Sequence, residues 1–350
     1  MRIVRLMTLA IVAAAVLVCA PTSAQRSPQT QKAGNRFGLS QAPQRAKGAI
    51  RVATYNTLNL FDPNDDPNLQ GEFDDINTPT SDDRCKALAA AIREMDADII
   101  ALQEVESLEA LTWFRDTYLP GAGYTWLASV DVGYYRGVEC SVMSRHEITR
   151  WHVWPDADLT RVPRPGPGWA QAPPEERLKF QRSPLYVEIK IDEDYTLSIF
   201  SVHHKAGRDF DYQREAEAAQ ICEYVNAIRK EDPARNIMVL GDFNAAPWDK
   251  SYRVYLEHGM IDTHGHRIIP RFEDAPQDEA RLFKTHESNK VLDYILLNSA
   301  AHRELVLGSA FVLGTLYPGD QYDWRTDQPP PGYASDHYPV AIELSPHDLQ

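Results

Sequence analysis

Six short segments of this 350-residue chain place polar or acidic residues at an end of an apolar run. They are Tyr55-Asn56-Thr57, Leu102-Gln103-Glu104, Val202-His203-His204, Gly241-Asp242-Phe243-Asn244, Leu292-Asp293-Tyr294 and Ser335-Asp336-His337. Apolar runs of this kind indicate buried strands, and in layered α/β proteins ligands bind where strands end. Together the segments supply carboxylates, amides and imidazoles, and no thiolate. That donor set suits a hard divalent ion, Mg²⁺ or Mn²⁺, whose shell is completed by substrate phosphate.

A carboxylate paired with an imidazole would add acid–base chemistry to this site. Asp293 with His337 would suffice, because a carboxylate fixes the imidazole tautomer and raises its basicity. Taken singly, each segment also has an ordinary structural explanation. Glu104 suits a helix N-terminus, and residues 242–244 could close a strand as an Asx-type turn. Their recurrence in order along the chain favours a shared site.

The elements that would position these residues alternate between strand and helix patterns. Strands are predicted at residues 50–55, 98–102, 124–129, 140–144, 185–191, 196–202, 237–240, 291–297, 304–313 and 338–344. Helices are predicted at residues 84–95, 107–118 and 212–229, where apolar residues recur at helical spacing. Strand followed by helix in two halves indicates the α/β or α+β class with packed layers.

The N-terminus has the pattern of a secretory signal peptide over residues 1–24. Arg2 and Arg5 precede an apolar run at residues 6–19, and small residues follow at 22–24. The run is shorter than the roughly 20 residues that a membrane span needs. We therefore expect a secreted or periplasmic protein with no stable membrane span; a retained anchor and a lipid on Cys19 are the alternatives. Residues 25–47 predict a disordered linker, and residues 48–350 a single catalytic domain.

Charge and cysteine content limit the partners. Lys and Arg number 36 against 50 Asp and Glu, a net charge of −14, and the seven basic residues of the first 47 leave a body with a net charge of −21. Such a body gains nothing from general attraction to nucleic acid. Residues 136–214 are neutral, with 12 basic and 12 acidic residues. After signal removal Cys85, Cys140 and Cys222 allow at most one disulfide, with its pairing open.

Three of the motifs are specific enough to indicate a family. They are Leu102-Gln103-Glu104-Val105, Gly241-Asp242-Phe243-Asn244-Ala245 and Ser335-Asp336-His337-Tyr338-Pro339-Val340. With these motifs in this order, the chain resembles the endonuclease/exonuclease/phosphatase superfamily over roughly residues 50–344. The resemblance implies the fold of deoxyribonuclease I and exonuclease III, a four-layer α/β/β/α sandwich of two packed mixed sheets flanked by helices. It also implies divalent-metal-dependent hydrolysis of a phosphoester.

The resemblance assigns roles residue by residue. Glu104 looks like the metal ligand with Asn56 beside it, and Asp336 like a further carboxylate on the metal side. Asp242 and Asn244 look like the pair that positions the attacking water and the phosphate.

His337 looks like the catalytic imidazole, oriented by Asp293. His203 looks like a second histidine that acts in catalysis or contacts phosphate, although the registration of His203 against His204 stays open. One departure from the family pattern argues against a function in DNA repair: the abasic-site endonucleases carry an acidic residue where this chain has Leu58.

Basic residues near the His203 segment complete the predicted site. Lys205, Arg208 and Arg182 are candidates for binding substrate phosphate. We therefore expect an exported phosphatase or phosphodiesterase that uses Mg²⁺, with Mn²⁺ or Ca²⁺ as alternatives, and that acts as a monomer on a small phosphate ester, a lipid headgroup or nucleic acid. The alternatives are an extracellular or periplasmic endonuclease cleaving DNA or RNA, and a non-catalytic binding domain that retains the fold.

Overall fold

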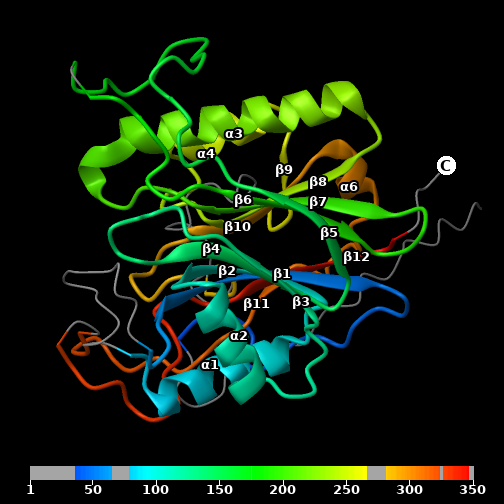
Figure 1. Ribbon diagram of the computed structural model, residues 1–350, viewed down its shortest axis with the longest axis vertical. Helices are drawn as coiled ribbons and strands as arrows, with labels where there is room; N and C mark the ends of the chain where they lie inside the picture. Colours follow the sequence, from blue (N-terminus) through cyan, green and yellow to red (C-terminus); the bar gives the residue numbers. More distant parts are fainter. Residues whose placement is uncertain (1–35, 65–78, 175, 266–280, 324–325, 347–350) are drawn as a thin grey trace, which may run out of the picture. The chain divides into compact units, whose positions relative to one another are not determined.

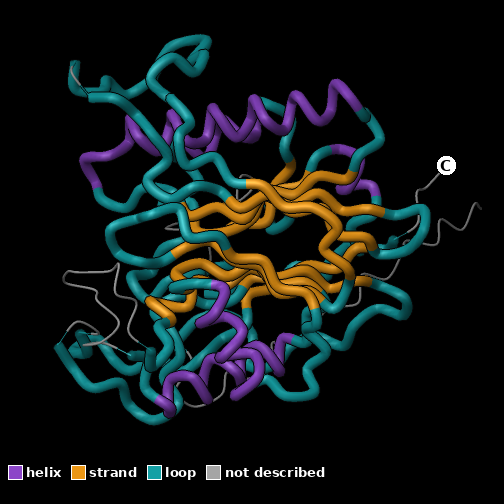
Figure 2. Tube along the Cα trace, in the orientation of Figure 1, coloured by secondary structure: helices purple, strands orange, loops and turns teal. Residues whose placement is uncertain are grey.

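Two six-stranded mixed sheets pack face to face in the computed structural model, and helices cover the outer face of each (Figures 1 and 2). The structure describes residues 36–64, 79–174, 176–265, 281–323 and 326–346. Strand order is β11-β12-β1-β2-β4-β3 in the first sheet and β5-β6-β7-β8-β10-β9 in the second. This arrangement confirms the predicted four-layer α/β/β/α sandwich.

The first sheet contains β1 (Ile50–Leu60), β2 (Ile99–Val105), β3 (Trp126–Ser129), β4 (Glu139–Ser144), β11 (Phe311–Val312) and β12 (Val340–Leu344). The second contains β5 (Glu147–His152), β6 (Leu185–Lys190), β7 (Thr196–His203), β8 (Asn236–Asp242), β9 (Ile261–Asp262) and β10 (Asp293–Leu297). Helices α1 (Asp82–Met95) and α2 (Leu108–Tyr118) lie on the first sheet, and α3 (Asp211–Glu231) and α4 (Lys250–Glu257) on the second (Figure 1). The short helices η1 (Arg208–Phe210) and α6 (Ser299–Arg303) are the remaining elements of the described residues.

Alternation along the strands divides the apolar residues between separate cores. On β7, Leu197 and Ile199 belong to the core between the two sheets, whereas Phe200 and Val202 belong to the core under α3. Successive side chains of a strand point to opposite faces, so a two-sided strand buries every residue. Strand β1 pairs in parallel with β2 in the first sheet, and β7 pairs in parallel with β8 in the second. Parallel pairing brings the carboxyl ends of those strands to one edge of the sandwich.

Residues 36–47 pack against the sandwich, which differs from the disordered linker expected over residues 25–47. Phe37 is 4% exposed and contacts the ring of Tyr338 edge-on. Arg45 forms an ion pair with Asp98 at 2.6 Å. One aromatic residue and one arginine thus dock a segment that has no periodic pattern. Residues 25–35 and the predicted signal peptide, residues 1–24, lie outside the described residues.

The strand predicted at residues 304–313 is largely absent. Only Phe311–Val312 forms a strand, and Glu304 instead ends α6, a helix whose N-cap Asn298 accepts a hydrogen bond from the Ala301 N–H. Gly308 has φ of 76°, which interrupts extended backbone between the apolar residues. Cys85, Cys140 and Cys222 are buried free thiols. No helix within the described ranges is long and apolar enough to cross a membrane.

Gly241 allows the close approach of β8 to β7 immediately before Asp242. Its φ is 142°, and a methyl group added there would lie 2.0 Å from the carbonyl oxygen of Val202. We expect Gly241→Ala to lower the free energy of unfolding by more than about 1 kcal/mol, because strain and a backbone clash add together. Urea denaturation measures this. Gly308→Ala is the control, since Gly308 also has positive φ but faces open space; equal losses in both variants would contradict the explanation.

Candidate active site

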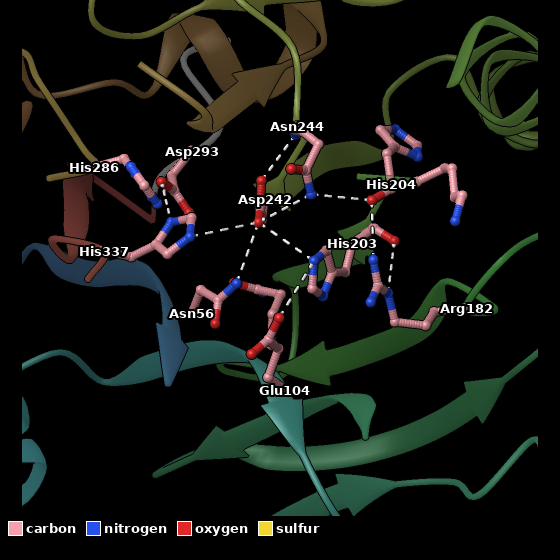
Figure 3. Close-up of polar contacts among 12 residues, drawn as sticks. Asn56, Glu104, Arg182, His203, His204, Asp242, Asn244, His286, Asp293 and His337 are labelled. Atoms are coloured by element: carbon pink, nitrogen blue, oxygen red, sulfur yellow. Dashed lines mark hydrogen bonds and ion pairs between the residues drawn. The ribbon is translucent and has the colours of Figure 1, made fainter. Parts of the chain in front are cut away.

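The polar strand ends singled out in the sequence meet at one edge of the sandwich. Asn56 on β1 and Glu104 on β2 face His203 on β7 and Asp242 on β8, so both sheets contribute (Figure 3). Strand β10 adds Asp293, which pairs directly with Asp242 in the β8–β10 register. The carboxyl ends of strands in layered α/β folds are the usual position for a ligand.

Asp242 is the centre of this cluster. Its Oδ2 accepts hydrogen bonds from Nδ2 of Asn56 and Nδ2 of Asn244, each at 3.1 Å. The same oxygen lies 3.3 Å from Nε2 of His203 and 3.7 Å from Nε2 of His337. Burial alone would raise the pKa of Asp242, but His337 and His203 hold it well below its usual range. Asp242 is therefore a buried carboxylate on which four side chains converge.

His337 and Asp293 form the pair expected from the sequence. Nδ1 of His337 donates to Oδ2 of Asp293 at 2.9 Å, which leaves Nε2 facing Asp242. Burial alone would lower the pKa of His337, but the carboxylates of Asp293 and Asp242 raise it well above its usual value. The backbone N–H of His337 also donates to Oγ of Ser335, which fixes the turn that carries the imidazole.

Glu104 lies on the first-sheet side of the cluster, next to an arginine that the sequence did not single out. Its Oε2 accepts a hydrogen bond from the Asn59 N–H at 3.0 Å. Its Oε1 lies 3.8 Å from Nε2 of His203 and 3.7 Å from Nη1 of Arg136. Arg136 also donates to Oδ1 of Asn59 at 2.6 Å. Only its position, in a glycine-flanked loop before β4, could have indicated Arg136.

Unusual backbone geometry directs these side chains. Among the described residues six non-glycine residues have positive φ, and four of them border the site: Leu58 at 54°, Asn59 at 54°, Glu104 at 63° and Asn244 at 47°. The β1–β2 register shifts between Asn56 and Leu60, as at a β-bulge. Bulges and left-handed residues re-aim side chains and concentrate at functional sites. The local strain therefore marks the same edge as the polar cluster.

The structure separates the two adjacent histidines. His203 faces the space between the sheets, on the same side of β7 as Ser201, whose Oγ accepts a hydrogen bond from Gln103 on β2. His204 points the other way, toward the helices, where Nδ1 lies 3.1 Å from Oε2 of Glu217 and Nε2 lies 2.8 Å from the Tyr255 hydroxyl. His203 thus joins the cluster, and His204 belongs to the layer under α3.

The three predicted substrate-binding cations have different surroundings. Arg182 is 3% exposed and donates to the carbonyl oxygens of His203 and His204 at 3.3 and 3.1 Å. These contacts place Arg182 beneath the end of β7, where it supports His203, rather than at an exposed substrate surface. Lys205 is half-buried over the ring of Phe210, and Arg208 is exposed on η1.

Asp336 borders the cluster beside His337 and a third histidine that the sequence did not single out. Oδ1 of Asp336 lies 4.0 Å from Nε2 of His337, and Oδ2 lies 3.4 Å from Nε2 of His286. The rings of His286 and His337 meet edge to face with centroids 4.5 Å apart (Figure 3). The His286-Glu-Ser-Asn segment precedes Asp293 by a few residues and has no apolar pattern, so its approach depends on the fold.

The donor set fits a hard divalent cation. The carboxylates of Glu104, Asp242 and Asp336 and the amide of Asn56 present oxygen ligands, and the three described cysteines are buried free thiols. No hydrogen bond from a described residue reaches the buried Oδ1 of Asp336, which leaves this oxygen available to a ligand. Side-chain ligand atoms of Asp242, Asp293 and His337 also lie within 4.8 Å of one another.

Comparison with known proteins gives one family and a consistent fold. A model described as the Endonuclease/Exonuclease/phosphatase family matches residues 53–337. The human Nocturnin catalytic domain with bound sulfate is 18% identical at a TM-score of 0.50, covering 86% of this chain and 96% of that one. A family protein from Bacteroides thetaiotaomicron is 19% identical at 0.50, covering 85% and 94%, and one from Bacteroides vulgatus is 16% identical at 0.50, covering 86% and 100%. No curated protein matches the chain.

Proposed function

The chain belongs to the endonuclease/exonuclease/phosphatase family, and we propose that it is a divalent-metal-dependent hydrolase of phosphoester bonds. The observation that carries the proposal is the convergence of Asn56, His203, Asn244 and His337 on Oδ2 of Asp242. A binding domain that merely retained the fold would have no need to keep this buried set together. Burying a charged carboxylate such as that of Asp242 is costly unless the charge is fully paired, and charged groups buried in this way are common at functional sites.

Glu104, Asn56 and Asp336 would hold the metal ion, since they present oxygen atoms at the border of the cluster. When bound, the ion supplies positive charge that neutralises the phosphate and polarises its bonds. We propose Mg²⁺ as the physiological ion, with Mn²⁺ or Ca²⁺ as substitutes, because all three prefer oxygen ligands.

The chain's own residues account for water activation and phosphate binding. A water hydrogen-bonded to the carboxylate of Asp242 gives its proton to that group as it attacks phosphorus, and Asn244 holds the carboxylate in place by donating from Nδ2 to its Oδ2 at 3.1 Å. His337 presents Nε2 to the phosphate because Asp293 holds its Nδ1–H. His203 presents Nε2 from the other side of Asp242 and stabilises the developing charge.

The substrate we propose is a small phosphate ester or a lipid headgroup rather than a long polyanion. The body carries a net charge of −21, and the residues around the His203 segment are neutral in sum. Counterion release from many Lys and Arg contacts provides most of the affinity for nucleic acid, and the negative net charge of the body opposes such binding. Export of the protein is proposed from the pattern of residues 1–24 alone; mass spectrometry of protein from the growth medium or periplasm should find a mature N-terminus near Gln25.

A panel of substrates tests the proposed function. Bis-p-nitrophenyl phosphate, p-nitrophenyl phosphate, sphingomyelin, inositol phosphates, plasmid DNA and RNA are each assayed with Mg²⁺, Mn²⁺ or Ca²⁺ and with EDTA. We expect hydrolysis of a small or lipid phosphoester that EDTA and His337→Ala both abolish. Activity that survives both treatments would overturn the proposal, and activity confined to DNA or RNA would replace it with a nuclease.

The two adjacent histidines should respond differently to removal. We expect His203→Ala to lower kcat by about 10²-fold or more, because it removes a group that contacts Asp242. His204→Ala should instead lower the free energy of unfolding by about 2 kcal/mol or more, because it leaves the Glu217 carboxylate buried without its imidazole partner. Steady-state kinetics and urea denaturation of both variants measure this. A fully stable but inactive His204→Ala would show that the assignment is reversed.

A further inference from the structure

We propose that His286 is a positioning residue of this site, a hydrogen-bond donor that engages Oδ2 of Asp336 and so reserves Oδ1 for the metal ion. The inference rests on the proposed function, in which Asp336 belongs to the metal site. It assigns a role to a histidine whose Nε2 is 3.4 Å from Oδ2 of Asp336 and whose ring is 20% exposed. It also excludes His286 as a metal ligand, although His286, Asp336 and His337 lie close enough to form a ligand group.

The tautomer of His286 follows from its own turn. The backbone N–H of Ser288 donates to Nδ1 of His286 at 2.9 Å, and the Ser288 hydroxyl lies 2.7 Å from the same nitrogen. A backbone N–H can only donate, so Nδ1 must be the unprotonated, accepting nitrogen. The proton of the neutral ring is then on Nε2, which is the atom that faces Asp336. A nitrogen that carries this proton donates a hydrogen bond and has no lone pair for a metal ion.

The backbone holds this donor in register with Asp336. The Glu287 N–H donates to the carbonyl oxygen of Asp336 at 2.9 Å, and the Tyr338 N–H donates to that of Thr285 at 2.7 Å. His286 and His337 consequently form an antiparallel bridge. Arg36 further ties the turn down by donating to the carbonyl oxygen of Glu287 at 3.0 Å. The approach of Nε2 to Asp336 is thus built into the pairing of two segments and does not depend on a mobile side chain.

The two carboxylate oxygens of Asp336 therefore have different partners. Oδ2 faces the Nε2–H of His286, while Oδ1 accepts no hydrogen bond within the part of the chain that the structure describes and lies 4.0 Å from Nε2 of His337. Partners that hold a ligating group from behind fix its orientation, and their loss typically weakens metal affinity by about 10- to 100-fold. Removal of the donor should free the carboxylate to rotate and make the two oxygens equivalent.

Nitrogen NMR of the metal-free protein tests the donor directly. The protein is labelled with ¹⁵N-histidine, and the ring signals of His286 are assigned by their loss in His286→Gln. Long-range ¹H–¹⁵N correlation should show a protonated Nε2 and an unprotonated Nδ1. The opposite tautomer would overturn the proposal. Because this measurement needs neither metal nor substrate, its outcome is independent of whether the protein hydrolyses phosphoesters.

Mn²⁺ titration followed by electron paramagnetic resonance tests the consequence. We expect His286→Leu to weaken Mn²⁺ binding by about tenfold or more, and His286→Gln to stay close to wild type, because the glutamine amide can donate from a similar position. His302→Leu, at a half-buried histidine on α6, is the matched control. Equal weakening by Gln and Leu would indicate a lost ligand or lost packing, and no weakening by either would show that His286 does not support Asp336; both results contradict the proposal.

Discussion

Asp242→Asn is expected to lower kcat for a phosphoester substrate by about 10³-fold. The amide keeps the size of the carboxylate but cannot accept a proton from the attacking water, and general base catalysis contributes about 10²- to 10⁴-fold. In the wild type, Oδ2 accepts hydrogen bonds from Asn56 and Asn244 and faces His203 and His337. An amide group in its place suits some of these donors poorly. Steady-state hydrolysis of bis-p-nitrophenyl phosphate measures the loss.

The control for this experiment is Asp209→Asn. Asp209 is an exposed aspartate on η1, whereas Asp242 is buried at the end of β8. It removes one negative charge without touching the strand ends, so kcat should stay near that of wild type. Circular dichroism of both variants excludes unfolding as the cause. A kcat for Asp242→Asn within tenfold of wild type would show that Asp242 is a structural carboxylate and not the acceptor of the water proton.

The largest effect on stability is expected at Arg51, which is fully buried on β1. Its guanidinium pairs with Glu343 on β12, with Nε 3.1 Å from Oε1, and donates to the carbonyl oxygens of Met95 and Pro43. Arg51→Met leaves the Glu343 carboxylate, which is 3% exposed, without its partner. We expect a loss of about 3–5 kcal/mol in the free energy of unfolding, because an uncompensated buried charge is costly. Urea denaturation monitored by tryptophan fluorescence measures it.

Two further variants separate the buried charge from the lost contacts. Arg51→Met combined with Glu343→Leu should recover much of the loss, since apolar residues can replace a buried ion pair. Arg150→Met, in which the exposed arginine pairs with the half-buried Glu188 at 3.6 Å, should cost less than about 1 kcal/mol. If the double variant were as unstable as Arg51→Met, the hydrogen bonds to Met95 and Pro43 would carry the stability and the charge argument would fail.

Period-two and helical spacing predicted most of the fold because the sandwich buries its strands on both faces. Predicted apolar runs coincide with the buried strands β1, β2, β7, β8, β10 and β12. Strand β5 was not predicted because it is a mostly exposed edge strand, with a pattern of polar residues around Ile148 and Trp151. The segment at residues 36–47 was expected to be a linker because its docking depends on single residues such as Phe37 and not on a repeating pattern.

The site could be predicted where an apolar run or a family motif adjoins the residue, and not where neither is present. Asn56, Glu104, His203 and Asp242 sit at or near strand ends and were identified from the apolar runs before them. Alternation along β7 could also have separated His203 from His204, because Val202 and His204 share the face toward α3. Arg136 and His286 reach the cluster from loops. No periodic pattern precedes them, so only the fold shows that they lie beside Glu104 and Asp336.

The central claim is that metal ion and phosphoester turnover share the cluster around Asp242. The most direct test first removes metal from the protein with EDTA and then titrates Mn²⁺ into the metal-free protein. Bound Mn²⁺, measured by electron paramagnetic resonance, and hydrolysis of bis-p-nitrophenyl phosphate are followed in the same sample. We predict that hydrolysis rises in proportion to bound Mn²⁺, and that Glu104→Gln shifts both curves together by at least about tenfold in Mn²⁺ concentration, because a carboxylate ligand is lost. Hydrolysis that persists in EDTA, or Mn²⁺ binding that Glu104→Gln leaves unchanged, would contradict the claim.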